Sequence, residues 1–151
     1  MKINLGAGND TKDGYINHDI TKHSDKIDIA IDLNLDNWSE AFLRSYNELF
    51  DEVCAFDVIE HLDDPVQFLN NCWELLKKGG VLKLKACGWQ NPNFWVDPTH
   101  KKGYDIKSFD FFDPDTELGK RYSYYTEKKW MIVSVNYDRR MNVIVEMEPR
   151  K

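Results

Sequence analysis

The sequence predicts an α/β fold, a three-layer sandwich with a mostly parallel sheet and an antiparallel C-terminal hairpin. Short β-rich runs alternate with helical patterns over the first half of the chain, which is typical of parallel strands joined by crossover helices. Two further β-rich runs close the chain. Its 151 residues suit one domain with one core, since domains commonly have about 100–150 residues. We therefore expect a single domain over residues 1–151.

Three short strands are predicted near the N-terminus. Lys2–Leu5 ends in a glycine turn, and Tyr15–Ile20 follows turn signals at Asp13 and Gly14. The link between these two strands is too short for an ordinary crossover helix. In Ile27–Leu33, isoleucine and leucine alternate with polar or small residues, which indicates a third strand.

A helix and a central strand are predicted next. Apolar residues recur at nearly helical spacing over Trp38–Leu49, and Asn37 or Ser39 is available as its N-cap. Phe50–Val58 is an almost continuous apolar run. Such a run is typical of a strand buried on both faces, so we expect it at the centre of the sheet.

A second helix is predicted after Asp63-Asp64-Pro65, where an acidic N-cap precedes a proline whose missing N–H costs nothing. Lys77-Lys78-Gly79-Gly80 should end this helix. Cations are favourable at the negative end of a helix, and glycine supplies the left-handed residue that stops it. Val81–Ala86 is then the next strand.

Residues 87–121 form a long segment with prolines and aromatic residues in no clear period, and loops of this length in compact domains are usually functional. Trp130–Tyr137 and Met141–Met147 are β-rich runs joined around Asp138-Arg139-Arg140, a predicted hairpin. Ligands of open α/β sheets bind outside the carboxyl ends of the strands. The loops expected to share one crevice begin at Gly6, Ile20, Leu33, Asp57 and Cys87.

Composition narrows the class of partner. The net charge of −6 disfavours a nucleic-acid backbone, which is bound by basic surfaces. The three cysteines match neither a zinc knuckle nor a redox pair. No apolar run approaches the roughly 20 residues that span a bilayer, and the N-terminus lacks the pattern of a signal peptide. We expect a cytoplasmic protein with no membrane partner.

The turn Leu5-Gly6-Ala7-Gly8 allows a ligand to approach the backbone, because glycine has no Cβ and tolerates positive φ. The turn lacks the third glycine of the dinucleotide fingerprint. That fingerprint also has an acid for the ribose roughly 20 residues further on, whereas Asp19 follows the turn sooner. Taken alone, the turn also fits a tight strand exit without a ligand. A nicotinamide-dependent oxidoreductase is a further alternative.

Four more stretches, read with this turn, carry a family resemblance. They are Asp13–Ile20, Asp32-Leu33, Asp51–Leu62 and Leu75–Leu82. The ordered set resembles the class I S-adenosylmethionine-dependent methyltransferases over nearly the whole chain. The last stretch resembles the family's leucine-lysine-proline-glycine-glycine sequence, with Lys78 in place of the proline, and Asp97–His100 resembles a downstream feature of one branch. The resemblance implies a Rossmann-like fold, S-adenosylmethionine as cofactor and S-adenosylhomocysteine as product.

Carried over by position, the resemblance implies a cofactor site. Its residues would be Leu5, Gly6, Ala7, Gly8, Asp19, Ile20, Asp32, Leu33, Phe56, Asp57 and His61. Asp19 would accept hydrogen bonds from the ribose hydroxyls, while Asp32 and Leu33 would lie beside the adenine. Both acids can alternatively be caps or turn formers, Phe56 can be a core residue, and His61 can be a structural histidine bonded to backbone.

Methyl transfer requires in-line approach of a nucleophile, and a base helps only where the acceptor is protonated. Asp97 and His100 are the candidate bases, and Trp89, Trp95 and Tyr104 are candidates for an apolar wall around the acceptor. His61, Asp97 and His100 are an alternative set of metal ligands, since Asp97 and His100 can face one way on a turn, but we expect no metal.

The sequence thus predicts a methyltransferase for a small-molecule or sugar-like acceptor. The alternative is a catalytically inactive S-adenosylmethionine-binding or interaction module in a complex. Members of the family usually carry helices before the first strand, and here that strand begins at Lys2. We therefore expect an open cleft, a large acceptor, or a second copy or partner subunit that covers the cleft.

Overall fold

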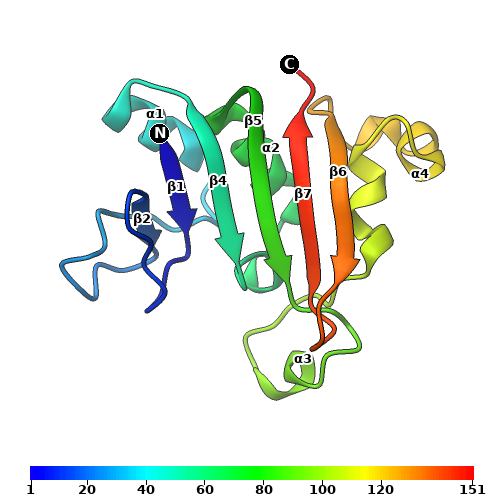
Figure 1. The fold of residues 1–151 in the computed structure, drawn as a ribbon, viewed down its shortest axis with the longest axis horizontal. Helices are drawn as coiled ribbons and strands as arrows, with labels where there is room; N and C mark the ends of the chain where they lie inside the picture. Colours follow the sequence, from blue (N-terminus) through cyan, green and yellow to red (C-terminus); the bar gives the residue numbers. More distant parts are fainter.

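A seven-stranded sheet forms the centre of the computed structural model, which describes all residues 1–151 (Figure 1). The strand order is β3-β2-β1-β4-β5-β7-β6. The strands are β1 (Lys2–Leu5), β2 (Ile16–Asp19), β3 (Ile29–Ala30), β4 (Phe50–Phe56), β5 (Leu76–Ala86), β6 (Trp130–Tyr137) and β7 (Val143–Pro149). Strands β1 to β5 pair in parallel, and β7 is antiparallel to both β5 and β6. The predicted Rossmann-like α/β fold with an antiparallel C-terminal hairpin is confirmed.

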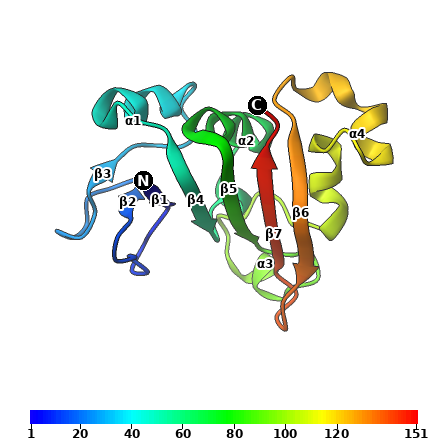
Figure 2. The same ribbon diagram turned by 45° about the horizontal axis from the view of Figure 1, so that its top comes forward.

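The larger helices gather on one side of this sheet, as Figures 1 and 2 show. The prediction of a three-layer sandwich was therefore wrong in its third layer, because the connections from β1 to β2 and from β2 to β3 contain no helix that could cover the other face. The α-helices are α1 (Trp38–Tyr46), α2 (Pro65–Leu75), α3 (Asn93–Val96) and α4 (Glu117–Arg121), and the 3-10 segments are η1 (Ile59–His61), η2 (Ile106–Phe112) and η3 (Ser123–Tyr125). As predicted, no helix connects β1 with β2. None of the helices combines the length and apolar character needed to span a bilayer.

The strand registers explain why the core lies on the helical side. Two rows of fully buried apolar side chains cross β1, β4, β5 and β7: Ile3, Val53, Leu82, Met147 and then Leu5, Ala55, Leu84, Val145. The row between them is Asn4, Cys54, Lys83 and Glu146. Because successive side chains of a strand point to opposite faces, the apolar rows face the helices and the polar row faces away.

The prediction that Phe50–Val58 is buried on both faces is therefore only partly right. The strand is central, between β1 and β5, but Asp51 is exposed and Glu52 forms an ion pair with Lys83 at 3.0 Å. Cys54 is buried on this second face, beside Glu52, whose carboxylate accepts from the Tyr15 hydroxyl. The loop before β2 thus covers part of the face that carries no helix.

The start of α2 is as predicted and its end is not. Asp64 caps the helix by accepting a hydrogen bond from the Gln67 N–H at 2.9 Å. The helix ends at Leu75, and Lys77–Gly80 lie in an irregular part of β5, where the register shifts by several residues. Gly79 has φ +75° there. The prediction of a helix end at Lys77–Gly80 was wrong because residue 76 already pairs with β4.

Three other boundaries differ from the sequence predictions. Asn37 has φ 52° and makes no cap bond, and Ser39 lies inside α1, where its hydroxyl donates to Asn71 of α2. The third strand contains only Ile29–Ala30. The segment 87–121 is not one loop, because it contains α3, η2 and α4. Within η2, Phe109 and Phe112 lie one turn apart and both pack into the core.

The predicted C-terminal hairpin is present, with its turn between Tyr137 and Val143. Within the turn, the Asp138 N–H donates to the Asn142 carbonyl at 2.9 Å. Because β7 runs antiparallel to β5, this turn lies at the edge of the sheet where β1, β4 and β5 end. The hairpin therefore brings Arg140 and Asn142 to the strand-end edge.

Candidate active site

Three adjoining cavities lie along the carboxyl ends of the parallel strands. The strand-end cavity has about 330 Å³ and is lined by Gly6, His18, Asp19, Ile20, Ile31, Asp32, Leu33, Asn34, Asp57, Val58, His61 and Leu62. The polar cavity has about 290 Å³ and is lined by Asp57, Glu60, His61, Lys85, Cys87, Asn91, Asn93, Val96, Asp97, His100, Arg140 and Asn142. The glycine-turn cavity is lined by Asn4, Gly6, Ala7, Asn9, Asp10, Phe56, Asp57 and Lys85. Asp57 borders all three.

The glycine turn after β1 depends on both of its glycines. Gly6 has φ +61°, and a Cβ at this position would lie 2.4 Å from Cγ2 of Val58. Gly8 has φ +51° with open space where a Cβ would be. Gly6 is thus required by close packing as well as by its conformation, whereas at Gly8 only the conformation favours glycine.

His18 of β2 fixes this turn and is fully buried. Its Nδ1 accepts from the Gly6 N–H at 3.2 Å, and its Nε2 lies 2.8 Å from the Ile31 carbonyl. The carbonyl can only accept, so the geometry assigns the proton to Nε2 and leaves the ring neutral. Burial lowers the His18 pKa, which favours this neutral form.

Asp19 at the end of β2 shapes the rim of the strand-end cavity. One carboxylate oxygen accepts from the Gly8 N–H at 2.6 Å, and the other accepts from the Ile20 N–H at 2.7 Å. Each oxygen retains a further lone pair, because a carboxylate offers about four acceptor positions. Ile20 is 59% exposed and supplies apolar surface beside this acid.

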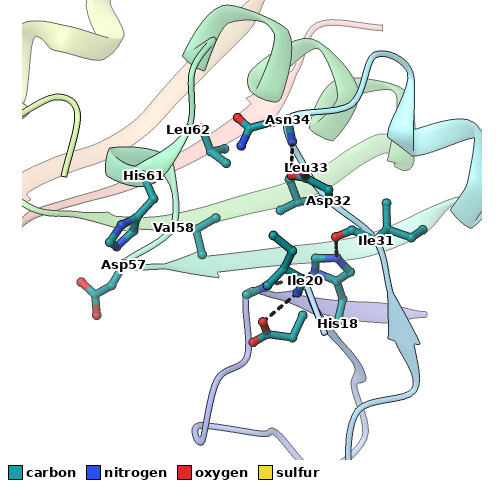
Figure 3. A pocket seen from close by; sticks show the side chains of 12 residues that line it. His18, Ile20, Ile31, Asp32, Leu33, Asn34, Asp57, Val58, His61 and Leu62 are labelled. Carbon is teal, nitrogen blue, oxygen red and sulfur yellow. Dashed lines mark hydrogen bonds between the residues drawn. The ribbon is translucent and has the colours of Figure 1, made fainter. Parts of the chain in front are cut away.

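The far side of the same cavity comes from the segment after β3. Asp32 accepts from the Asn34 N–H at 2.9 Å, so it forms a turn as well as lining the cavity. Asn34 in turn accepts from the Asp63 N–H at 2.9 Å. Figure 3 shows Leu33 and Leu62 among the lining side chains, which gives the cavity apolar walls beside its three acids.

Asp57 lies directly after β4 in a left-handed conformation, with φ 58°. Its N–H donates to the Lys85 carbonyl at 2.8 Å, and its carboxylate pairs with the Lys85 ammonium. Residues other than glycine that are held in this conformation often mark functional sites. The strand end therefore projects a carboxylate to the border of the cavities.

Glu60 in the polar cavity is completely buried, with 0% exposure. Its Oε1 accepts from the Cys87 N–H at 3.0 Å, while its Oε2 has no hydrogen-bond partner. Burial is the main cause that raises the Glu60 pKa to about 7. Burial also raises the Cys87 pKa to about 11, so this thiol is neutral near pH 7.

Two histidines lie next to Glu60. Nδ1 of His61 is 2.9 Å from Oγ1 of Thr99, and that hydroxyl donates to Asp97 at 2.6 Å. Since the Thr99 hydrogen is directed to Asp97, His61 carries its proton on Nδ1 and leaves Nε2 free to accept. The rings of His61 and His100 have centroids 4.7 Å apart, and His100 Nε2 lies 3.8 Å from the Asp97 carboxylate.

The structure brings most of the expected cofactor residues together but leaves some aside. Leu5 and Ala7 are buried, and Leu5 faces the core. Phe56 lines only the glycine-turn cavity, where the Lys12 ammonium lies 5.0 Å from its ring.

Asp97 and His100 line the polar cavity, while the expected aromatic wall does not. Trp89 and Trp95 are 50% and 78% exposed and border none of the three cavities. Tyr104 is buried, donates to the Ile59 carbonyl at 3.3 Å and lines a separate apolar pocket beneath η2.

Sequence reasoning missed several residues that line these cavities. His18 lies inside a predicted strand. The preceding glycine turn is the only local feature that indicates a backbone N–H to which its ring can bind. Glu60 lies within the stretch Asp51–Leu62 that carries the family resemblance, but no local pattern there indicates a buried acid. Arg140 and Asn142 belong to a hairpin turn, and no local pattern connects that turn with β4.

Comparison with known proteins gives a family match. A model described as a methyltransferase domain matches residues 23–84. A ubiquinone biosynthesis O-methyltransferase of Cereibacter sphaeroides is 38% identical over 71 residues, which are 47% of this chain and 27% of the relative. The same-named protein of Dinoroseobacter shibae is 37% identical over 71 residues, again 47% of this chain and 27% of the relative. The chain thus matches only about a quarter of the length of these curated relatives.

Solved structures share the fold over nearly the whole chain. A complex of DhpI with SAM and HEP has a TM-score of 0.63 at 13% identity, covering 98% of this chain and 78% of that one. The N-methyltransferase NodS of Bradyrhizobium japonicum, solved with S-adenosylhomocysteine, has a TM-score of 0.59 at 15% identity, covering 99% and 78%. A putative methyltransferase in complex with the Trm112 activator of Haloferax volcanii has a TM-score of 0.63 at 10% identity, covering 97% and 81%.

The strand order and the strand-end cavities define a Rossmann-like fold of the class I methyltransferase type. The sequence match over residues 23–84, about two fifths of the chain, is to a methyltransferase domain and is consistent with the resemblance to class I S-adenosylmethionine-dependent methyltransferases.

Proposed function

We propose that this chain binds S-adenosylmethionine in the strand-end cavity and methylates a polar, hydroxyl-bearing small molecule held in the polar cavity. The observation that carries the proposal is the sharing of Asp57 and His61 between the two cavities. A donor and an acceptor bound in adjoining cavities can meet at their common border, and such positioning supplies much of the catalysis of group transfer.

The residues of the strand-end cavity fit this cofactor. Its volume of about 330 Å³ is within the range of roughly 300–1,000 Å³ of small-molecule sites. Asp19 offers free carboxylate lone pairs to the ribose hydroxyls, and Ile20 and Leu33 offer apolar surface to the adenine. Asp32 is placed to accept from the adenine amino group. The open backbone at Gly8 leaves room beside the turn.

The polar cavity favours a sugar-like acceptor over an aromatic one. Only Cys87 and Val96 of its lining residues are hydrophobic. Arg140, Asn93 and Asn142 supply hydrogen-bond donors from two separate segments. An acceptor with several hydroxyl groups would satisfy these donors, whereas an apolar ring would leave buried polar groups without partners.

When bound, S-adenosylmethionine supplies a methyl group on a positively charged sulfur, and the acceptor oxygen takes this methyl as the carbon–sulfur bond breaks. The hydroxyl proton must then be removed. We assign its removal to the Asp97–His100 pair, because His100 lines the polar cavity and its Nε2 lies 3.8 Å from the carboxylate. Hydrogen bonds from the Thr99 side chain and amide lower the Asp97 pKa, which keeps this acid charged.

Calorimetric titration with S-adenosylhomocysteine tests the cofactor site, with NADH as the competing ligand class. We expect S-adenosylhomocysteine to bind and NADH not to bind. Asp19→Asn should weaken binding about tenfold or more, since hydrogen bonds to charged groups contribute roughly 1.5–3 kcal/mol. Asp25→Asn, in an exposed loop outside the cavities, is the matched control and should bind as the wild type does.

Turnover is tested by formation of S-adenosylhomocysteine from S-adenosylmethionine with panels of polyol and phenol acceptors. Polyols should support turnover better than phenols. Absence of S-adenosylhomocysteine binding by folded protein would contradict the proposal. Binding without turnover on any acceptor would contradict its catalytic part.

A further inference from the structure

The polar cavity contains a cluster of metal-ligating side chains, of which only His61 also lines the strand-end cavity. Glu60, His61 and His100 each offer one ligand atom, and these three atoms all lie within 4.8 Å of one another. Two of the residues come from η1 and the third from the segment after α3. Two histidines and one carboxylate are a donor set that binds Zn²⁺ and other first-row divalent ions.

Two buried polar atoms in this cluster have no partner. Oε2 of Glu60 and Nδ1 of His100 are both buried without a hydrogen bond. Glu60 is 0% exposed and the His100 side chain 8% exposed. A buried polar group without a partner is costly, so native proteins rarely leave one unsatisfied. A bound cation would satisfy both atoms together.

The third ligand is oriented by its surroundings. His61 donates from Nδ1 to Thr99, which donates to Asp97, and this leaves the Nε2 lone pair of His61 free. Metal-binding histidines usually donate their other ring N–H to a carboxylate or another acceptor, which fixes the tautomer and the ring orientation. Asp97 also lies 3.8 Å from His100, so one carboxylate supports both histidines.

We propose that Glu60, His61 and His100 form a binding site for a divalent first-row transition-metal ion such as Zn²⁺. Bonds from nitrogen or oxygen to Zn²⁺ are about 2.0–2.1 Å long, so two ligand atoms on one ion lie at most about 4.2 Å apart. The three ligand atoms therefore need to approach one another by less than about 1 Å to bind one ion. Its role rests on the proposed function: a hydroxyl of the acceptor bound to the ion becomes more acidic. His100 is then a ligand, and Asp97, which lines the same cavity, receives the proton in place of the Asp97–His100 pair.

The first experiment measures metal binding without any assay of activity. Protein treated with a chelator is titrated calorimetrically with Zn²⁺, and a second sample is titrated with Co²⁺ while its visible absorption is recorded. We expect one ion per chain and Co²⁺ bands of the intensity typical of four- or five-coordinate sites. No Zn²⁺ binding at millimolar concentration by folded protein would overturn the proposal.

Variants then assign the ligands. Glu60→Gln keeps the shape of the side chain and an acceptor for the Cys87 N–H, so it should fold and bind Zn²⁺ at least tenfold more weakly. Thr99→Val should weaken binding by about 10–100-fold through the loss of the His61 support. The matched controls are Glu127→Gln and His23→Gln, both exposed and outside the cluster, and they should bind Zn²⁺ as the wild type does.

The same samples are titrated with S-adenosylhomocysteine. Unchanged S-adenosylhomocysteine affinity with no metal binding would overturn the metal site alone. Metal binding that is unaffected by Glu60→Gln and by His100→Gln would also overturn it. Failure of S-adenosylhomocysteine to bind, with Zn²⁺ still bound, would instead overturn the proposed function. Circular dichroism of each variant establishes that it is folded.

Discussion

Gly6 and Gly8 share a left-handed conformation but differ in what surrounds them. A Cβ on Gly6 would meet Val58 at 2.4 Å, while a Cβ on Gly8 would meet nothing within 4 Å. The left-handed conformation itself costs a residue other than glycine about 1–2 kcal/mol. Only Gly6 therefore carries an additional penalty from packing.

We predict that Gly6→Ala lowers the free energy of unfolding by about 2–5 kcal/mol, the sum of this strain and of about 1–3 kcal/mol of overpacking. Gly8→Ala should cost only about 1–2 kcal/mol. In the double variant Gly6→Ala/Val58→Ala the clash is removed, so the two changes should cost less together than their sum. Urea unfolding of the wild type, of Gly6→Ala, Gly8→Ala and Val58→Ala, and of the double variant measures these values. Equal losses for the two glycine variants would contradict the prediction.

His18 makes the same turn sensitive to pH. Burial lowers the pKa of His18 below its ordinary value, so the folded protein keeps the ring neutral while the unfolded chain binds a proton at about pH 6.5. The unfolded state then holds more protons below that pH, and stability falls as the pH falls from 7 through the lowered pKa. Protonation would also place a hydrogen on Nδ1, opposite the Gly6 N–H.

The measurement is the free energy of unfolding of wild type and His18→Gln between pH 7 and pH 5. The wild type should lose stability more steeply, because the variant lacks this titration. Burial also lowers the His61 pKa, but His61 is present in both proteins and its contribution cancels in the difference. Parallel curves for the two proteins would show that His18 does not titrate in this way.

At the scale of single elements, α1 and α2 begin differently. Asp64 caps α2 through its carboxylate, whereas Asn37 precedes α1 with φ 52° and no side-chain cap bond. A side-chain cap typically contributes about 1 kcal/mol, and a residue with positive φ is replaced by glycine without strain. The two positions therefore form a matched pair.

Asp64→Ala should lower the free energy of unfolding by about 1 kcal/mol. Asn37→Gly should leave it unchanged or raise it slightly, because glycine adopts the left-handed conformation more easily. Thermal and urea unfolding of both variants test the pair. A loss in Asn37→Gly equal to that in Asp64→Ala would mean that the Asn37 side chain stabilises α1 in another way.

At the scale of the whole molecule, the sheet has an apolar face toward the helices and a charged face away from them. Leu84 and Lys83 are neighbours in β5 and point to opposite faces. Leu84 is fully buried in the core, whereas Lys83 is partly exposed and pairs with Glu52. Glu52 also accepts from Tyr15, so the loss of Lys83 does not leave it without a partner.

Leu84→Ala should therefore cost about 2–5 kcal/mol of stability through lost contacts and the remaining cavity. Lys83→Ala should cost less than about 1 kcal/mol, as for other partly exposed ion pairs. Denaturant unfolding of both variants measures the difference. Similar losses would mean that the face without helices is also buried, for example against another molecule.

Local signals were sufficient for most elements of this protein. The strand Lys2–Leu5 before its glycine turn, the Asp64-Pro65 helix start and the hairpin around Asp138 were all predictable because they depend on neighbours in sequence. The end of α2 was not, because Lys77–Gly80 fit a helix end and a strand bulge equally well. Pairing of residue 76 with β4 decided between them.

The sequence by itself determined the order of strands and helices along the chain outside residues 87–121. It also determined the glycine turn and the acids Asp19 and Asp32 at strand ends, since each depends on local conformation or on recognisable motifs. Tertiary structure alone decided that the core occupies one face of the sheet, that Tyr104 is buried away from the cleft, and that Arg140 and His100 join Glu60 in the polar cavity. These contacts join residues far apart in the chain. Their geometry is set by strand pairing and packing, which no short stretch of sequence encodes.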